Sequence, residues 1–313
     1  MKKIIALALA LIMVFALCAC GSKEAPAASD TNVPAAPAEP APTAPADMPE
    51  EPEGDGVAEG EPVAPAFETV TEGVLTVATS PDYAPYEFYA IGEDGTASLA
   101  GFDIELAKYI AAELGLEIEF VPMDFDGVLM EVGLGTVDMG VAGLSPDPER
   151  AESMLFSDSY YDGGQAFNTS QAKAEQFTDL ASANQPGLQI GAQIGTIQEG
   201  LAQEFSADAD LVSLPKATDI IAELISGKLD GAYIEWDVAL SYQQNYPELV
   251  IVCEVPYEAE GNVIGIPLGN EALLEAVNAA LNKCVEEGTF ANFVAQAWEL
   301  AGGEIIEGLL PEA

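Results

Sequence analysis

The clearest helical pattern in the chain is Gly101-Phe102-Asp103-Ile104-Glu105-Leu106-Ala107-Lys108-Tyr109-Ile110-Ala111-Ala112-Glu113-Leu114-Gly115. Its large apolar residues recur at helical spacing, and Gly115 is suited to the left-handed conformation that ends many helices. The runs Gly73–Thr79 before it and Leu116–Val121 after it have the length and composition of strands. Strands that alternate with helices predict an α/β protein with largely parallel sheets.

A second pattern occurs twice: a helix-forming run, then Gly-x-x-Asp, then a buried strand. The first copy is Phe125–Leu134, Gly135–Asp138 and Met139–Ala142, and the second is Ile220–Ser226, Gly227–Asp230 and Gly231–Ile234. The repeat is weak, but it suggests two lobes of similar build. Ligands of such folds bind beyond the carboxyl ends of the strands. The two strands lead into Gly143–Arg150 and into Glu235, which are therefore candidate site residues.

The composition excludes several kinds of function. The chain has 53 acidic residues, nine basic residues and a net charge of −44, so we expect it to repel nucleic acid. It has no histidine, which removes the usual general base and the usual metal ligand. Cys253 and Cys284 lack metal-ligand spacing and are either two free thiols, which we favour, or one disulfide. We expect no metal, no cofactor and no catalytic residue.

The N-terminal segment is typical of an exported lipoprotein. Lys2 and Lys3 precede the apolar run Ile4–Leu17, which is too short to span a membrane. The run ends in Leu17-Cys18-Ala19-Cys20-Gly21, which resembles a bacterial lipobox with Cys20 as the modified cysteine; the alternative is an ordinary cleaved signal. Residues 21–72 are rich in Ala, Pro and Glu, and we expect a disordered tether. A diacylated Cys20 would anchor the protein stably to a membrane.

Arg150 is the only arginine in the chain. A guanidinium can grip a carboxylate through two parallel hydrogen bonds, which lysine cannot do. We therefore interpret Arg150 as a carboxylate clamp. The alternative is a surface arginine without a function.

Four segments carry a family resemblance: Tyr83-Ala84-Pro85-Tyr86, Gly101–Leu106, Gly143–Arg150 and Gly195-Thr196-Ile197-Gln198-Glu199. Together they resemble the bacterial extracellular solute-binding proteins, family 3, which bind polar amino acids for ABC importers. The resemblance covers about Gly73 to Leu300. It implies a two-lobed periplasmic-binding-protein-like α/β fold (type II) with two hinge strands and a ligand cleft between the lobes. The expected division is signal peptide 1–20, tether 21–72, lobe one 73–163 and 266–303, hinge strands and lobe two 164–265, and tail 304–313.

The resemblance also implies roles for individual residues. Arg150 would bind the ligand α-carboxylate, helped by the backbone N–H groups of Ser145 and Ile197 and by a helix that starts near Thr196. The α-ammonium would meet the Gly143 carbonyl, the Ser145 hydroxyl and the Glu235 carboxylate. Tyr83 would form an aromatic wall, and Gln193 and Ser80 would lie near the ligand side chain.

Two positions depart from the family pattern. Glu235 stands where aspartate is usual, and Ile197 replaces a common hydroxyl residue. The alternatives to the binding roles of Glu235 and Tyr83 are that Glu235 is an exposed acid at a helix start and that Tyr83 only packs within its loop. Ser80 stands where binders of basic amino acids can carry an acid, which argues against a basic ligand. No lysine lies in the matched site segments, so the second carboxylate of an acidic ligand would have no cation as partner. We therefore expect a neutral polar or small amino acid as ligand, including a sulfur-containing one.

The predicted function is a monomeric substrate-binding lipoprotein that delivers an amino acid to an ABC permease. It would act on the outer face of the cytoplasmic membrane, which is extracellular in a bacterium without an outer membrane and periplasmic otherwise. We expect no enzymatic activity. The alternatives are an exported dehydratase-like enzyme on the same scaffold and a ligand-sensing module that acts with a separate receptor.

Overall fold

The computed structural model describes residues 67–92, 94–257 and 261–302. The predicted signal peptide, Cys20, most of the tether and the tail 304–313 lie outside these residues. Within them, each helix is too short or too polar to cross a membrane.

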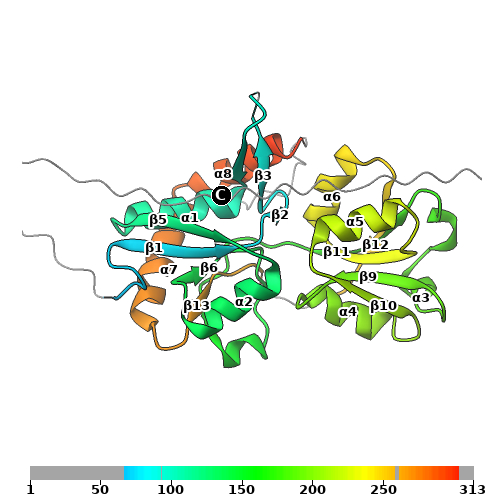
Figure 1. Cartoon of the computed structure of the whole chain (residues 1–313), viewed down its shortest axis with the longest axis horizontal. Helices are drawn as coiled ribbons and strands as arrows, with labels where there is room; N and C mark the ends of the chain where they lie inside the picture. The colour runs from blue at the N-terminus through cyan, green and yellow to red at the C-terminus, as the bar shows by residue number, and fades with distance from the viewer. Residues whose placement is uncertain (1–66, 93, 258–260, 303–313) are drawn as a thin grey trace, which may run out of the picture. The chain divides into compact units, whose positions relative to one another are not determined.

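The first sheet has five strands in the order β5-β1-β6-β13-β7 (Figure 1). β1 (Val74–Thr79) pairs in parallel with β5 (Glu117–Pro122) and β6 (Met139–Gly140), while β13 (Gly265–Pro267) pairs antiparallel with β6 and β7 (Met154–Phe156). Its helices are α1 (Phe102–Glu113), α2 (Phe125–Leu134), α7 (Glu271–Glu286), α8 (Thr289–Leu300) and the short η1 (Arg150–Glu152). We call this sheet with its helices lobe 1.

The second sheet also has five strands, in the order β10-β9-β11-β8-β12. β9 (Gln189–Gln193) pairs in parallel with β10 (Asp210–Leu214) and β11 (Gly231–Glu235), and β8 (Gln165–Ser170) pairs antiparallel with β11 and β12 (Leu249–Glu254). Its helices are η2 (Ala174–Gln176), α3 (Leu180–Ala183), α4 (Ile197–Phe205), α5 (Ala217–Ile225) and α6 (Trp236–Asn245). We call this part lobe 2.

Helices cover both faces of each sheet, and strand alternation explains why. Val77 of β1 packs into the cluster formed with α1, α7 and α8, whereas its neighbour Ala78 packs into the cluster formed with α2. In β11, Ala232 packs with α5 and α6 and Tyr233 with α3 and α4. Figure 1 shows α5 and α6 on one side of the second sheet and α3 and α4 on the other. Such two-sided burial is what nearly continuous apolar strands require.

A third, smaller sheet lies between β1 and α1 in the chain. It is the antiparallel unit of β2 (Asp82–Tyr83), β3 (Glu87–Ile91) and β4 (Ala97–Ala100). Glu87 and Phe88 are buried, while Tyr89 is exposed. The hairpin therefore carries Asp82, Tyr83 and Glu87 towards the interior.

The chain passes between the lobes twice, once between β7 and β8 and once between β12 and β13. The two connecting segments meet at an antiparallel bridge between Tyr161 and Asn262. The predicted fold class, an α/β protein of two lobes, is confirmed; the residue boundaries predicted for the lobes stay predictions. Cys253 and Cys284 are both free thiols, as favoured from the sequence.

Candidate functional site

One cavity brings together all nine residues predicted from the sequence to bind the ligand. The nine predicted lining residues are Ser80, Tyr83, Gly143, Ser145, Arg150, Gln193, Thr196, Ile197 and Glu235. Six further lining residues were not predicted: Asp82, Glu87, Phe125, Ala142, Gln165 and Gln198. Both lobes contribute side chains, so the cavity lies between them.

The guanidinium of Arg150 is held in place by backbone carbonyls. Nη1 donates to the carbonyl of Ser145 at 2.8 Å, and Nη2 donates to the carbonyl of Gly195 in lobe 2 at 2.9 Å. The guanidinium carbon also lies 5.4 Å from the centroid of the Phe125 ring. Burial lowers the pKa of Arg150 from its usual value. With two of its five N–H groups used in this way, the remaining donors can serve a ligand carboxylate in a fixed orientation.

The N-terminus of α4 faces the same cavity. Thr196 is the N-cap: its Oγ1 accepts from the backbone N–H of Glu199 and donates to the carbonyl of Gln193 at 2.7 Å. Ile197, the first helical residue, lines the cavity beside Arg150. A helix N-terminus next to a guanidinium is an arrangement that favours an anion.

Glu235 is a buried carboxyl group, not the exposed helix acid of the alternative interpretation. It ends β11 and caps α6, with Oε2 accepting the backbone N–H of Val238 at 2.7 Å, and its side chain is only 2% exposed. Oε1 has no hydrogen-bond partner among the described residues. Burial, and then the neighbouring Asp237, raise the pKa of Glu235 well above its usual value. The free oxygen is therefore able to accept a hydrogen bond from a ligand ammonium.

The Gly143 turn is fixed by two long-range hydrogen bonds. Its N–H donates to Asp103 Oδ2 at 2.8 Å, and its carbonyl accepts from Asn262 Nδ2 at 2.9 Å. Its φ of +54° suits glycine, and an added Cβ would lie 3.2 Å from the Tyr83 ring. The carbonyl predicted to meet the ligand ammonium is thus already engaged by Asn262, although a second lone pair remains.

Tyr83 and Ser80 each contact neighbours in the cavity wall. The Tyr83 ring packs against Tyr86 with centroids 5.7 Å apart, and its hydroxyl accepts from Gln198 Nε2 of lobe 2 at 3.1 Å. Ser80 Oγ donates to Asp82 Oδ1 at 2.9 Å. Gln193 Nε2, from the end of β9, donates to the carbonyl of Pro215 at 3.0 Å. Through the hydrogen bond from Gln198, Tyr83 contacts lobe 2 as well as its own loop.

Asp82 was missed by the sequence analysis. Its Oδ2 accepts the backbone N–H of Ala217, the first residue of α5 in lobe 2, at 2.6 Å. Its backbone carbonyl accepts from the Tyr242 hydroxyl of α6 at 3.0 Å. Burial raises the pKa of Asp82, although the hydrogen bonds from Ser80 and Ala217 oppose this. Asp82 thus lines the cavity and joins lobe 1 to lobe 2.

Glu87 was also missed, and it is fully buried (0% exposed). Together with Asp82 and Glu235 it gives the described cavity wall three carboxyl groups against the single guanidinium of Arg150. The only sequence signal for the burial of Glu87 was the position of this residue between aromatic residues in a strand-forming run, Tyr86-Glu87-Phe88. Gln198 lies inside a segment that was singled out, Gly195–Glu199, but only its neighbours were assigned.

No group of three or more Cys, Asp or Glu side chains among the described residues has a geometry that could hold a metal ion. The cavity wall supplies hydrogen-bonding groups and charged side chains. A guanidinium and a helix N-terminus suit a carboxylate, and Glu235 suits an ammonium group. A zwitterion buried there would have both charges paired, which burial of charge requires.

Comparison with known proteins places the chain among solute-binding proteins. Residues 75–298 match the family model of the bacterial extracellular solute-binding proteins, family 3. The arginine-binding extracellular protein ArtP of Bacillus subtilis is 31% identical over 219 residues, which cover 68% of this chain and 82% of that protein. Cyclohexadienyl dehydratase of Pseudomonas aeruginosa is 28% identical over 180 residues, which cover 58% of this chain and 66% of that enzyme.

The structural comparison points the same way. The crystal structure of the amino acid ABC transporter substrate-binding protein AbpA from Streptococcus pneumoniae, bound to L-arginine, aligns with a TM-score of 0.70 at 32% sequence identity. The alignment covers 74% of this chain and 96% of that one. The chain is thus similar to amino-acid-binding proteins over both lobes.

Proposed function

The chain belongs to the bacterial extracellular solute-binding proteins, family 3, and on that premise we propose that it captures a cationic amino acid and delivers it to an ABC permease. Arg150 and the α4 N-terminus hold the α-carboxylate, and Glu235 holds the α-ammonium. The protein acts as a monomer and binds its ligand without transforming it. This proposal replaces the sequence-based expectation of a neutral polar or small ligand.

The observation that carries the proposed ligand class is the charge of the cavity wall. After Arg150 and Glu235 are assigned to the two backbone charges of an amino acid, Asp82 and Glu87 remain as carboxyl groups beside the Tyr83 ring. Asp82 already accepts hydrogen bonds from Ser80 and Ala217, but neither oxygen of the fully buried Glu87 has a partner among the described residues. A buried carboxyl group needs a donor or a cation as partner. A guanidinium or ammonium side chain supplies both, and a guanidinium also stacks well on an aromatic face. Two similar proteins, ArtP and AbpA, are named for arginine or bound to it, which supports arginine as the first candidate.

Calorimetric titration of the full-length protein in detergent tests this proposal. We expect arginine, lysine and ornithine to bind, with weaker or undetectable binding of glutamine and glutamate. Arg150→Ala should lower arginine affinity about a thousandfold, because it removes one partner of a buried charge pair. Lys228→Ala, which removes an exposed lysine of lobe 2, is the matched control and should bind normally. Exclusive binding of neutral or acidic amino acids contradicts the ligand class.

The same samples distinguish binding from catalysis. Arginine recovered unchanged after prolonged incubation supports a binding protein. Conversion of a bound compound, for instance by loss of water or carbon dioxide, would favour the dehydratase-like alternative.

We further propose that Cys20 carries the lipid that holds the protein on the outer face of the membrane. The lipobox sequence and the extracellular character of the family support this. Cys20→Ser should shift the protein from the membrane fraction to the soluble fraction. A Cys20→Ser protein that stays with the membrane contradicts the proposal.

A further inference from the structure

One member of a pair of buried carboxyl groups belongs to the cavity wall. Glu87 of β3 lines the cavity, and Asp103 stands in the first turn of α1; both are 0% exposed. The charge of Asp103 acts on Glu87 and raises its pKa. Because a nearby like charge disfavours ionisation, the two buried groups are more stable when they hold one proton than when both are ionised.

The surroundings place that proton on Glu87. Asp103 Oδ2 accepts two other hydrogen bonds, from the backbone N–H of Gly143 at 2.8 Å and from the Tyr160 hydroxyl at 3.0 Å. Neither oxygen of Glu87 accepts a hydrogen bond from a donor among the described residues. Asp103 is therefore the better stabilised anion, and Glu87 is the neutral acid of the pair.

The electrostatic environment agrees with this assignment. Burial, and then the charges of Asp103 and Asp82, raise the pKa of Glu87 well above its usual value, while burial raises the pKa of Asp103 to about 6. The titratable groups that act on this pair are Asp82 and Tyr83 of β2, Tyr160 of the segment that connects the lobes, and Tyr242 of α6. Each of these can only add negative charge, which favours the protonated form of Glu87 in the ligand-free site.

We propose that a cationic ligand side chain displaces this proton, so that the site exchanges one H⁺ for the charge of the ligand. In the exchange, the O–H bond of Glu87 breaks, its carboxylate pairs with the guanidinium or ammonium group, and the proton leaves to the solvent. A nearby cation favours the ionised form of a carboxyl group, which is the physical reason for the release. The inference rests on the proposed function, since it requires a cationic ligand.

The exchange makes ligand affinity depend on pH. Where Glu87 is protonated in the free protein and ionised in the complex, arginine affinity should rise roughly tenfold per pH unit. Citrulline has the same α-carboxylate and α-ammonium as arginine but a neutral side chain. It should leave the proton in place, so its affinity should stay nearly constant over the same range.

Calorimetry of the full-length protein in detergent, in buffers of different ionisation enthalpy near neutral pH, measures the proton directly. We expect arginine to release about one proton more than citrulline. Glu87→Gln should abolish the extra release, because glutamine has the shape of the protonated acid but no proton to lose. Asp138→Asn, which alters another buried carboxyl group of lobe 1 (2% exposed) away from the cavity lining, is the matched control and should keep the release.

The outcomes separate the two proposals. Equal proton release with arginine and citrulline, or undiminished release in Glu87→Gln, overturns the proton exchange while arginine binding itself stands. Failure of arginine to bind the unaltered protein overturns the proposed ligand class and the exchange together. If Glu87→Gln does not fold, the arginine–citrulline difference in the unaltered protein decides.

Discussion

The Gly-x-x-Asp turn occurs once in each lobe, and both copies make the same pair of hydrogen bonds. In lobe 1, the Asp138 N–H donates to the carbonyl of Thr76 at 2.9 Å, and the Thr76 N–H donates to Asp138 Oδ2 at 2.7 Å. In lobe 2, the Asp230 N–H donates to the carbonyl of Gln189 at 2.8 Å, and the Gln189 N–H donates to Asp230 Oδ2 at 2.7 Å. Each aspartate thus ties its turn to a strand of the same sheet, β1 or β9.

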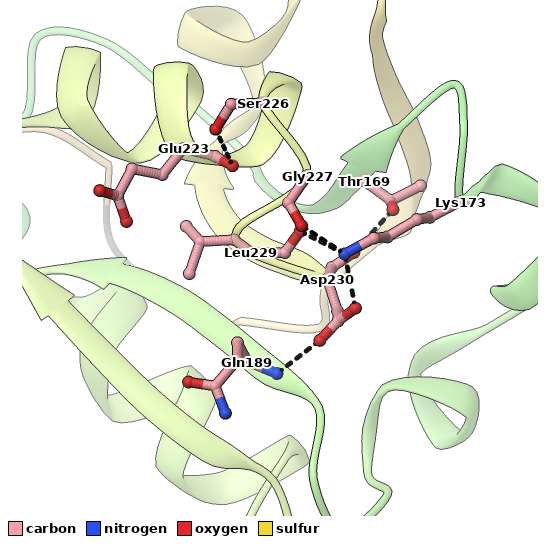
Figure 2. A network of polar contacts seen from close by, with 8 residues as sticks. All are labelled: Thr169, Lys173, Gln189, Glu223, Ser226, Gly227, Leu229 and Asp230. Carbon is pink, nitrogen blue, oxygen red and sulfur yellow. Dashed lines mark hydrogen bonds and ion pairs between the residues drawn. The ribbon is translucent and has the colours of Figure 1, made fainter. Parts of the chain in front are cut away.

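The two turns differ in the partner of the other carboxylate oxygen. Asp138 Oδ1 accepts the backbone N–H of Val70 at 2.7 Å. Asp230 Oδ1 instead pairs with the Lys173 ammonium at 2.7 Å, and this ammonium also donates to the carbonyls of Gly227 and Leu229 (Figure 2). Figure 2 shows the Lys173 side chain reaching into the turn from the segment that follows β8.

One local motif thus stabilises its aspartate in two ways. Lobe 1 uses backbone N–H donors alone, whereas lobe 2 adds the charge of a lysine, in a chain that has only nine basic residues. The lobe 2 pair is about four-fifths buried, with 20% and 19% of the Lys173 and Asp230 side chains exposed. The lobe 2 turn should therefore be the more sensitive of the two to loss of its aspartate.

Asp230→Ala should have the largest effect on stability. It leaves the Lys173 ammonium without its counter-charge and the Gln189 N–H without its acceptor, so we expect a loss of about 3 kcal/mol. Urea unfolding of the unliganded protein measures this loss. Arginine affinity should change little once the protein is folded, because the turn does not line the cavity. A loss below that of the corresponding lobe 1 variant would contradict the ranking.

Asp138→Ala should follow, with a loss of about 2 kcal/mol. Asp138 is only 2% exposed, and its removal leaves the buried N–H of Thr76 without a partner. The Val70 N–H lies near the surface, where water can replace the lost acceptor. Asp138→Asn keeps one acceptor oxygen and should lose less in the same urea experiment; equal losses would argue against a hydrogen-bond origin.

Much of the fold could be predicted because apolar periodicity is a local property. The helix expected at Phe125–Leu134 agrees residue for residue with α2. The helix expected at Ile220–Ser226 instead begins at Ala217. The reason is a long-range contact: Lys216, the N-cap, makes no side-chain capping bond, and Asp82 of the other lobe accepts the Ala217 N–H. A contact from residue 82 to residue 217 leaves no trace in the local sequence.

The residues of the cavity wall likewise include some that the local sequence predicts and some that it does not. Arg150 could be predicted because a single guanidinium in an acidic chain is conspicuous, and the segments around it resemble a known family. Asp82 and Glu87 could not, because nothing local distinguishes these two acids among 53 acidic residues. Their burial depends on how the β2–β3 hairpin packs against α1 and lobe 2. The sequence-based expectation of a neutral ligand did not take these two carboxyl groups into account.

Lys173→Met should have a smaller effect than either aspartate substitution, about 1 kcal/mol, which is the net contribution of a typical hydrogen bond. Methionine keeps much of the aliphatic stem, and the Asp230 carboxylate, 19% exposed, can still accept from Gln189 and from water. This variant makes the lobe 2 turn resemble the lobe 1 turn, which has no lysine partner among the described residues. In the Lys173→Met background, Asp230→Ala should therefore cost about as much as Asp138→Ala, about 2 kcal/mol.

Lys228→Met is the matched control for that experiment and has the smallest expected effect. Lys228 belongs to the same turn but pairs on the surface with Glu223, with 68% of its side chain exposed. Exposed pairs contribute little, so we expect a change within about 0.5 kcal/mol. Urea unfolding in low and high salt separates the two lysines, because screening weakens an exposed pair more than a buried one. Equal losses for Lys173→Met and Lys228→Met would mean that the buried Lys173–Asp230 pair stabilises the protein no more than an exposed pair does. The difference between the two turns would then have no energetic consequence.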